Sequence, residues 1–460
     1  MSGHDFERRP VVRARVLAAA MAMLCLISAC AQIPTNGSVQ AGLDELDYEP
    51  RSGYLLASGP TPGANRVEIV QGFLRAISAG PEDDFAVARE YLTEDARRTW
   101  SPAERIVVHP TSSSLEPLLD DQDSVHLMTA ITATLDREGR YSQAASGAEE
   151  EFTFTLVEDS EGEWRISQAP DATLMSAANF DFLYRATPIY FASQDRERLV
   201  AELRWFSERN QATAAAEAVL SGPAPWLQDA VFQPAPAGVR LSTEGVVIED
   251  GVATVGLSDQ ILTASLEARG VLAAEMQQTL LRVPGVHAVE LQSDSVPLVA
   301  EIPTIDREPI ATGTLMALSV LSNDGSGGED EGGDEERPVL LEYTDGVFNP
   351  LEDLILPDRP QDFAVSLAEP RVVAVAHPEG ISRVREDGEP VMLLEQKSVR
   401  SISWDRRDWL WVSKSGTESQ LIVINVNGEY QELAADWLVG REVIEARVAR
   451  DGARVLIISR

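Results

Sequence analysis

Apolar residues begin to recur at helical spacing just after Asn65. The residues on this spacing are Ile69, Val70, Phe73, Leu74 and Ile77, and positions three or four apart share one face of a helix. Asn65 and Glu68 have the spacing of a capping box, in which each side chain accepts a hydrogen bond from the other residue's backbone. The pattern predicts a helix that begins after Asn65 and ends at Gly80 and Pro81.

A second short helix is expected over residues 84–91, and segments typical of strands follow it. These segments are residues 105–108, 125–135, 152–157 and 164–167. Phe152, Phe154 and Leu156 alternate with polar residues, as the buried face of a strand requires. Helices followed by a long antiparallel sheet predict an α+β domain over residues 65–186.

The next stretch of sequence alternates helical and strand patterns and predicts a compact α/β domain over residues 187–308. Its helices end at sites rich in Gly and Pro, such as Ser221-Gly222-Pro223. Asp250-Gly251 suits the positive φ of a tight hairpin turn. The expected elements are a strand at 189–191, a helix at 211–220, a hairpin at 246–255, a helix carrying Leu272, Met276, Leu280 and Val283, and a strand at 286–291.

Beyond residue 309 the chain is expected to be all β. Strand pairs are predicted at 363–368 with 372–375, at 399–404 with 410–412, and at 444–449 with 455–458. Their turns carry Glu369-Pro370, Arg406-Arg407-Asp408 and Asp451-Gly452. A spacing of ~40 residues matches the blade repeat of a β-propeller, and an irregular all-β sandwich is the alternative.

This third domain, residues 309–460, is expected to be an incomplete propeller-like domain. About three blades of sequence are present, whereas closed propellers need roughly four to eight. Residues 323–336 are acidic and rich in glycine, so they predict a solvated loop.

The N-terminus carries a short apolar run at residues 16–27, preceded by four arginines. The run is too short for a spanning helix of ~20 residues and predicts a signal peptide over residues 1–29. Small residues Ser28 and Ala29 lead to Cys30, which predicts a lipobox that accepts S-diacylglycerol and N-acyl groups. The alternative is an ordinary signal peptide. Residues 30–64, rich in Gly and Pro, are expected to be the lipidated tether.

The number of cysteines and the net charge exclude further classes of function. The chain holds two cysteines, Cys25 and Cys30, so cleavage at the lipobox leaves one, which the lipid occupies. No disulfide and no cysteine-based metal site or nucleophile then remains. A net charge of −36 has the wrong sign for nucleic acid and repels anionic lipid headgroups.

Residues able to carry catalysis or bind metal are sparse in this sequence. None of His109, His126, His287 and His377 has metal-ligand spacing, and His126 and His287 are expected to be hydrogen-bonded and partly buried. The nucleophile-elbow, phosphate-loop and zinc-helix motifs are missing. We therefore predict no catalytic residue, no metal and no cofactor.

Two further groups of residues leave alternatives open. Asp120, Asp121 and Asp123, together with the acidic stretch 324–336, lack the spacing of a calcium loop, so solvated loops are favoured over Ca²⁺ sites. Trp404, Trp409 and Trp411 are either an exposed binding patch or part of the packing of a blade, and their place in alternating strands favours packing.

Four stretches of the sequence resemble the actinobacterial lipoprotein LpqB family. They are the lipobox at Cys30, IVQGFLRAIS from Ile69, AREYLTEDARRTW from Ala88, and AVLSGPAPWL from Ala218. The second domain, with LSGP, GVATVGLS and TLLRVPGVHAVEL, is similar to the GerMN domain of sporulation and germination proteins. The third domain looks like the family's propeller, which is usually longer.

The resemblance implies a non-enzymatic accessory lipoprotein on the outer face of the cell membrane. In this family the expected partner is the extracellular domain of an Mtr-type two-component sensor kinase, in cell-envelope homeostasis and division. A receptor for a cell-wall glycan or small ligand is the alternative, because a curved-sheet domain can hold a pocket. A cell-wall hydrolase is a third hypothesis, and it requires carboxylates that converge in a cleft.

Overall fold

The computed structural model describes residues 58–460, except 79–84, 121–123, 308–314, 322–336, 368–370, 387 and 416–420. Cys25, Cys30, the signal peptide and most of the tether lie outside the described residues. So do the helix stop at Gly80 and Pro81, the turn at Glu369-Pro370 and the acidic loop. Residues 1–53 and 54–460 form separate units, and the second unit contains every element described below.

Helix α2 (Arg66–Ser78) begins where the capping box predicted. The Glu68 N–H donates to Asn65 Oδ1 at 3.0 Å, and the Asn65 N–H donates to Glu68 Oε2 at 2.8 Å. Two donors that the first helical turn leaves without partners are thereby satisfied. The predicted apolar face is buried along its whole length, so both the helix and its inward face are confirmed.

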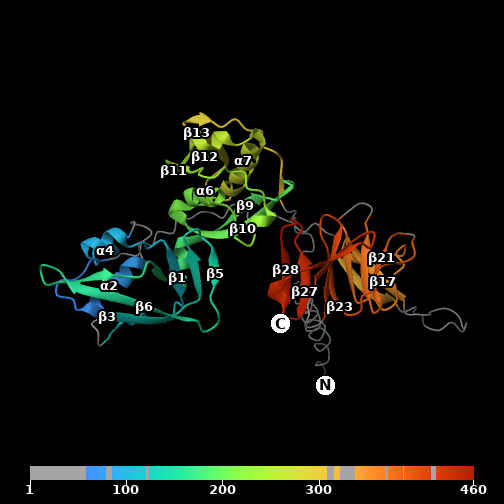
Figure 1. The fold of residues 1–460 in the computed structure, drawn as a ribbon, viewed down its shortest axis with the longest axis horizontal. Helices are drawn as coiled ribbons and strands as arrows, with labels where there is room; N and C mark the ends of the chain where they lie inside the picture. The colour runs from blue at the N-terminus through green and yellow to red at the C-terminus, as the bar shows by residue number, and fades with distance from the viewer. Residues whose placement is uncertain are drawn as a thin grey trace, which may run out of the picture. The chain divides into compact units, whose positions relative to one another are not determined.

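Two four-stranded sheets complete the first domain, which spans elements α2 to α5 (Figure 1). One sheet has the order β2-β3-β6-β7 and is antiparallel, and the other has the order β5-β4-β1-β8, with β1 and β8 parallel. The strands are β1 (Arg105–His109), β2 (Leu118–Leu119), β3 (Ser124–Ala130), β4 (Ala133–Asp136), β5 (Tyr141–Gln143), β6 (Glu149–Glu158), β7 (Trp164–Gln168) and β8 (Thr173–Ser176).

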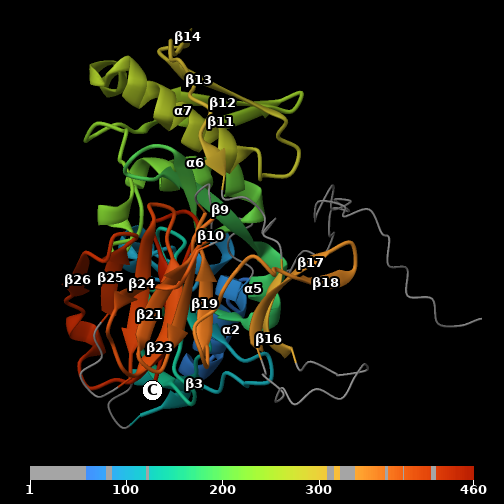
Figure 2. The same ribbon diagram turned by 90° about the vertical axis from the view of Figure 1, so that its right-hand side faces the viewer.

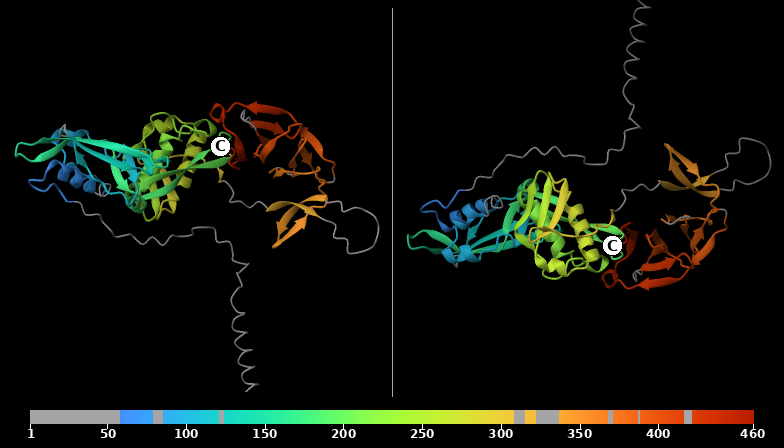
Figure 3. Two further views of the ribbon diagram at one scale, coloured as in Figure 1. Left: turned by 90° about the horizontal axis from the view of Figure 1, so that it is seen from below. Right: turned by 90° about the horizontal axis from the view of Figure 1, so that it is seen from above.

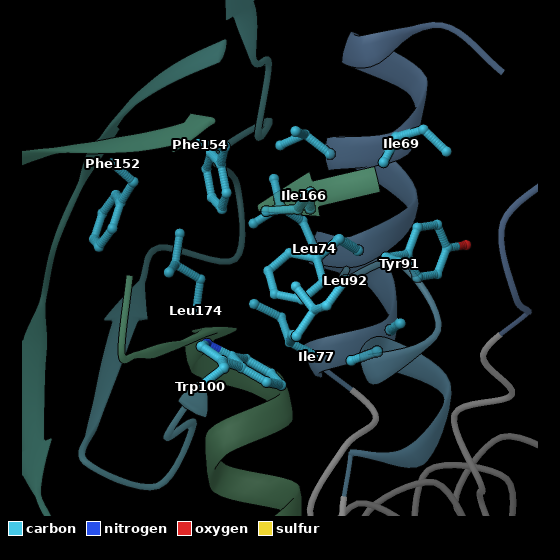
Figure 4. Close-up of a cluster of buried hydrophobic side chains, with 14 of the residues drawn as sticks. Ile69, Leu74, Ile77, Tyr91, Leu92, Trp100, Phe152, Phe154, Ile166 and Leu174 are labelled. Atoms are coloured by element: carbon cyan, nitrogen blue, oxygen red, sulfur yellow. The ribbon is translucent and has the colours of Figure 1, made fainter. Parts of the chain in front are cut away.

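The core of this domain lies between α2 and the inner face of the β2-β3-β6-β7 sheet. Phe73 packs against Trp100 and Phe154, with ring centroids 5.2 and 6.1 Å apart. Figure 4 shows Trp100, Phe154 and Leu174 beside the α2 side chains Leu74 and Ile77. Aromatic burial on this scale, rather than helix propensity, holds α2 in place.

Three short helices in this domain differ from the sequence-based prediction. The helix expected over 84–91 is limited to α3 (Ala86–Arg89), and α4 (Glu94–Thr99) and α5 (Ala177–Leu183) were missed. Thr93 and Ser176 cap α4 and α5 through side-chain oxygens. Helices of four to seven residues span fewer than two turns, which is too short for a 3.6-residue period to emerge.

The second domain, β9 to β15, has two sheets and two main helices (Figure 2). The sheets have the orders β15-β10-β9 and β11-β12-β13-β14, with β12 and β13 parallel and joined through α7. The elements are β9 (Tyr184–Ala192), β10 (Arg198–Ser207), α6 (Gln211–Ser221), β11 (Leu241–Glu249), β12 (Val252–Leu257), α7 (Leu266–Leu280), β13 (Ala288–Ser293), β14 (Val296–Pro297) and β15 (Asp306–Arg307).

The hairpin predicted around Asp250-Gly251 is confirmed. Asp250 and Gly251 have φ values of 50° and 78°, and two successive positive φ values are what a tight hairpin turn requires. Strand β10 is the main omission from the predicted order, since it pairs with β9 along its whole length.

The third domain consists of consecutive antiparallel sheets. Each of two sheets has four strands in sequence order, which is the arrangement of a propeller blade. The strands are β16 (Met316–Leu321), β17 (Arg337–Thr344), β18 (Val347–Pro350), β19 (Asp362–Val365), β20 (Val373–His377), β21 (Gly380–Val384), β22 (Val391–Leu394), β23 (Val399–Trp404), β24 (Trp409–Lys414), β25 (Leu421–Asn425), β26 (Tyr430–Leu433), β27 (Val443–Val448) and β28 (Val455–Ser459).

All three predicted strand pairs are present, as β19–β20, β23–β24 and β27–β28. The sheets β16–β18, β19–β22, β23–β26 and β27–β28 follow one another without closing into a ring, within the part of the chain that the structure describes (Figure 3). The predicted fold class is confirmed: a multidomain chain with an α+β domain, an α/β domain and an all-β, partial propeller-like domain.

Candidate functional site

The predicted lipidation residue, Cys30, lies outside the described residues and stays a prediction. Among the residues that the structure describes, none of the helices has the length and apolar character to cross a membrane.

His126 is hydrogen-bonded and half-buried, as predicted. Its Nε2 lies 2.9 Å from Asp120 Oδ2, and its Nδ1 lies 3.2 Å from Glu151 Oε1. Asp120 also accepts a hydrogen bond from the Ser124 N–H at 2.8 Å, so its carboxylate is held by the start of β3. Asp121 and Asp123 lie outside the described residues.

The other histidines have separate surroundings. His109 and His377 are buried, and loss of hydration lowers the pKa of both imidazoles. His287 is exposed, which corrects its predicted partial burial: it lies one residue before β13, beside the Gly251 turn. No group of three or more His, Cys, Asp or Glu side chains suited to a metal ion occurs in the described ranges.

Two of the three tryptophans considered in the sequence, Trp404 and Trp411, belong to blade packing, as favoured there. Trp404 is buried, and its Nε1 donates to the Ala364 carbonyl of β19 at 3.1 Å, linking two neighbouring sheets. Trp411 Nε1 donates to Asp405 Oδ2 at 3.1 Å. These indoles are therefore committed to internal hydrogen bonds rather than to a binding patch.

A buried ion pair explains the LSGP segment of the second domain. Arg204 is completely buried on β10, and its Nε lies 2.8 Å from Glu202 Oε1. Its Nη2 donates to the Gly222 carbonyl at 2.6 Å, and Glu202 Oε2 accepts from the Ala224 N–H at 2.8 Å. Gly222 adopts a φ of 84° where α6 ends, a conformation that glycine takes at little cost. The LSGP segment is therefore the C-terminal end of α6, held by hydrogen bonds to the buried Arg204–Glu202 pair.

Helix α7 supplies a second buried carboxyl group, Glu275. Its Oε1 accepts from the Ala192 N–H of β9 at 2.8 Å, and one turn away Thr279 Oγ1 accepts from the Tyr190 N–H at 3.0 Å. Strand β9 is a sheet edge, so these side chains satisfy edge donors that would otherwise be unpaired. Burial raises the pKa of Glu275 well above its ordinary value, against the smaller opposite effect of the Ala192 hydrogen bond.

Ion pairs join the β9–β10 turn to the β23–β24 turn. Asp195 contacts Arg406 and Arg407, and Glu197 contacts Arg406 at 2.8 Å. Burial by itself would raise the pKa of Asp195. The opposing effects of hydrogen bonds from Ser193, Arg407 and the Glu197 N–H, together with the Arg406 charge, are larger and hold it well below its usual value. The Asp195 carboxylate is therefore charged at neutral pH when this contact is formed.

The start of α7 displays a cluster of exposed apolar side chains, here called the α7 patch. More than half of each side chain is exposed: Leu262 53%, Leu266 60%, Val299 75% and Ile302 53%. The segment that carries Val299 and Ile302 lies against α7, because the Glu301 carbonyl and Pro303 contact Gly270, one helical turn after Leu266. A side chain at Gly270 would push this segment away.

Charged groups surround the α7 patch. Glu267 pairs with Arg196 at 2.6 Å, and the Arg269 guanidinium donates to the Leu262 carbonyl. An apolar centre with a charged rim is the usual anatomy of a protein interface. The sequence analysis did not predict the patch. One signal was available, because Leu266 is an apolar residue that lies outside the buried Leu272–Met276–Leu280 face of the helix.

Three family models match the chain. One described as "Lipoprotein LpqB, N-terminal domain" matches residues 59–181, one described as "Sporulation and spore germination" matches residues 188–299, and one described as "Lipoprotein LpqB beta-propeller domain" matches residues 339–460.

Curated relatives are similar along nearly the whole chain. A lipoprotein LpqB of Thermobifida fusca is 26% identical over 97% of this chain and 80% of its own length, and one of Bifidobacterium longum is 26% identical over 96% and 76%. The first GerMN domain of the Bacillus subtilis sporulation protein GerM, 19% identical, covers 28% of this chain and 94% of its own, with a TM-score of 0.22.

The three folds and their matches define a multidomain protein that joins a germination-type domain to a propeller-like domain. The chain belongs to the lipoprotein LpqB family. That family is named for a lipoprotein rather than for an enzymatic activity.

Proposed function

We propose that this chain is a lipid-anchored accessory protein on the extracytoplasmic face of the cell membrane. It binds the extracellular domain of an Mtr-type membrane sensor kinase and modulates its signalling in cell-envelope homeostasis and division, without catalysis of its own. The observation that carries this proposal is the α7 patch, because exposed apolar side chains on neighbouring segments, beside charged groups, favour a protein partner.

The proposed anchor supports such a role physically. Two or more acyl chains on Cys30 give stable attachment where one chain would be marginal. Attachment confines the protein to the membrane that holds the kinase, which raises the effective concentration of each partner without any new contact. The net charge of −36 keeps the folded body away from anionic headgroups.

The test is direct binding between the delipidated chain and the extracellular domain of the kinase, measured by calorimetry. Leu266→Ser and Ile302→Ser should each weaken the Kd by about tenfold or more, since central apolar contacts carry most of the binding free energy. Leu118→Ser is the matched control, because Leu118 is also an exposed leucine, on β2 of the first domain.

Two results contradict the proposal. One is the absence of association at high micromolar concentration. The other is an equal effect of Leu118→Ser and Leu266→Ser, which would mean that general surface hydrophobicity, and not the α7 patch, drives the binding.

A receptor for a cell-wall glycan or other small ligand is the second candidate function. The observation that favours it is a cavity of about 280 Å³ that is lined by residues of both the first and second domains. Asp136 is the one carboxylate among its lining residues, whereas glycoside hydrolysis ordinarily uses a pair. The cavity therefore favours binding over hydrolysis.

A further inference from the structure

The cavity lies between the β5-β4-β1-β8 sheet of the first domain and the junction of β10 and α6 in the second. Its volume is about 280 Å³, close to the lower end of the ~300–1,000 Å³ range of small-molecule pockets. Apolar side chains from both domains contribute to its walls, among them Phe85, Pro102, Ile106, Leu135, Phe206 and Ala214. A ligand of monosaccharide size therefore fits.

Contacts between the two domains hold one wall of the cavity in place. The Trp205 N–H donates to the Gly139 carbonyl at 2.8 Å, which joins the β4–β5 turn to β10. Gly139 has a φ of 81°, and a Cβ there would lie 2.8 Å from the Trp205 carbonyl oxygen. Tyr141 packs on Trp205 with ring centroids 4.9 Å apart. A cavity formed in advance spares a ligand the cost of ordering it.

The charged groups at the cavity already have partners. Arg137 lies 4.0 Å from Glu104, and Arg209 also has an interaction partner. Asp136 accepts a hydrogen bond from the Arg140 N–H at 2.8 Å. The Arg140 guanidinium lies within 4.0 Å of two further carboxylates, those of Glu138 and Glu202. A charged ligand would have to replace one of these contacts, whereas an uncharged ligand leaves all of them in place.

Several uncharged polar groups that line the cavity have no hydrogen-bond partner among the residues that the structure describes. They are the hydroxyls of Tyr184 and Ser207, the indole N–H of Trp205 and the side-chain amide of Asn210. Burial raises the pKa of Tyr184, and no hydrogen bond or charge opposes this effect. Tyrosine and tryptophan usually find hydrogen-bond partners where they are buried, so a ligand with hydroxyl groups would supply the missing ones.

We infer that the cavity binds an uncharged sugar of monosaccharide size, whose hydroxyl groups form hydrogen bonds with these unpartnered polar groups. A sugar ring combines apolar C–H surface with hydroxyls, and it therefore matches a cavity that has apolar walls and a few polar groups. This inference rests on the second candidate function, that of a receptor, and names the class of its ligand. It is independent of the kinase proposal.

Three sugars with the same six-membered ring test the ligand class on the whole delipidated chain. Glucose is uncharged, glucuronic acid carries a carboxylate, and glucosamine carries an ammonium group below neutral pH. Saturation-transfer NMR titrations should show that glucose binds at millimolar concentration. The two charged sugars should bind at least about tenfold more weakly, because bringing an unpaired charge into the cavity is unfavourable.

Tyr184→Phe and Asn210→Ala should each weaken glucose binding by roughly two- to tenfold, which is the contribution of one uncharged hydrogen bond. Tyr184→Phe keeps the ring that stacks on Phe180 at 5.1 Å, and Asn210 is exposed, so both variants should fold, which thermal denaturation checks. Tyr141→Phe is the matched control, because Tyr141 packs on Trp205 but does not belong to the lining of the cavity.

Glucuronic acid or glucosamine binding as tightly as glucose would overturn the inference and leave a receptor function standing. If none of the three sugars binds at millimolar concentration, the inference and the glycan receptor on which it rests fail together. An equal loss in Tyr141→Phe and Tyr184→Phe would also overturn the inference, because the sugar would then bind elsewhere. A loss confined to Tyr184→Phe and Asn210→Ala supports it.

Discussion

Glu275 is a residue whose buried surroundings change its acid–base chemistry. Burial raises its pKa in the folded protein, so the native state holds this proton more tightly than the unfolded chain does. The stability that follows is fully present below the ordinary pKa of a glutamate and is lost as the pH rises through the folded-state pKa. The buried side chain thus makes the second domain less stable in alkali.

Replacing Glu275 with Gln should remove this contribution to the pH dependence. The amide oxygen can still accept from the Ala192 N–H, and the side chain no longer ionises. Urea unfolding at several pH values should show similar free energies of unfolding at low pH and a growing advantage for Glu275→Gln as the pH rises. Glu217→Gln, at an exposed position on α6, is the control. A constant offset between Glu275→Gln and wild type would contradict this account.

At the scale of elements, β10 shows how a strand can escape detection. Leu199 and Val200 are apolar, but the inward positions that follow Val200 are Glu202 and Arg204. Charged residues at inward positions contradict the alternation expected of a strand. They are buried because each meets the other and the end of α6, and those partners lie up to 22 residues further along the chain.

Arg204→Met should therefore destabilise the second domain by about 3–5 kcal/mol, because the buried Glu202 carboxylate loses its 2.8 Å partner and keeps only Arg140, 4.0 Å away. The measurement is the free energy of unfolding in urea. The double variant with Glu202→Leu should lose less than the sum of the two single variants, since both charges are removed together. Additive losses would show that the pair does not act as a unit.

Helices, strands and turns were predicted best where they depend on residues close together in the sequence. The capping box of α2, the Asp250-Gly251 turn and the three propeller hairpins each depend on residues close in sequence. Elements with mixed or very short patterns, such as α4, α5 and β10, were missed. His287 was predicted to be partly buried because it alternates with Val289 and Leu291. It is exposed, and β13 begins one residue after it.

At the scale of the whole molecule, the proposed lipid on Cys30 determines that the protein is located at the membrane. Cys30→Ala should abolish lipid labelling and release the protein from the membrane fraction, because the acyl chains are the proposed attachment. Metabolic labelling with a fatty acid and membrane fractionation measure both effects, with Ser28→Ala, a small-to-small change, as the control. A Cys30→Ala protein that is still lipidated and membrane-bound would contradict the assignment.

The domains of the described chain are joined by specific contacts. The first and second domains share the Trp205–Gly139 hydrogen bond and aromatic packing around Tyr141, and the second and third share the Asp195–Arg406 ion pair and an Arg454 hydrogen bond to the Ala201 carbonyl at 3.1 Å. The candidate cavity lies at the first of these two junctions.

By itself the sequence determined the lipobox prediction, the acidic net charge, the three fold classes and most of the regular elements, because these depend on composition and on neighbours a few positions apart. Only the tertiary structure decided where Glu275 and Arg204 are buried, that the segment carrying Ile302 lies against α7, and that residues of the first and second domains line one cavity. The physical reason is distance along the chain: burial and charge pairing arise from residues that folding alone brings together.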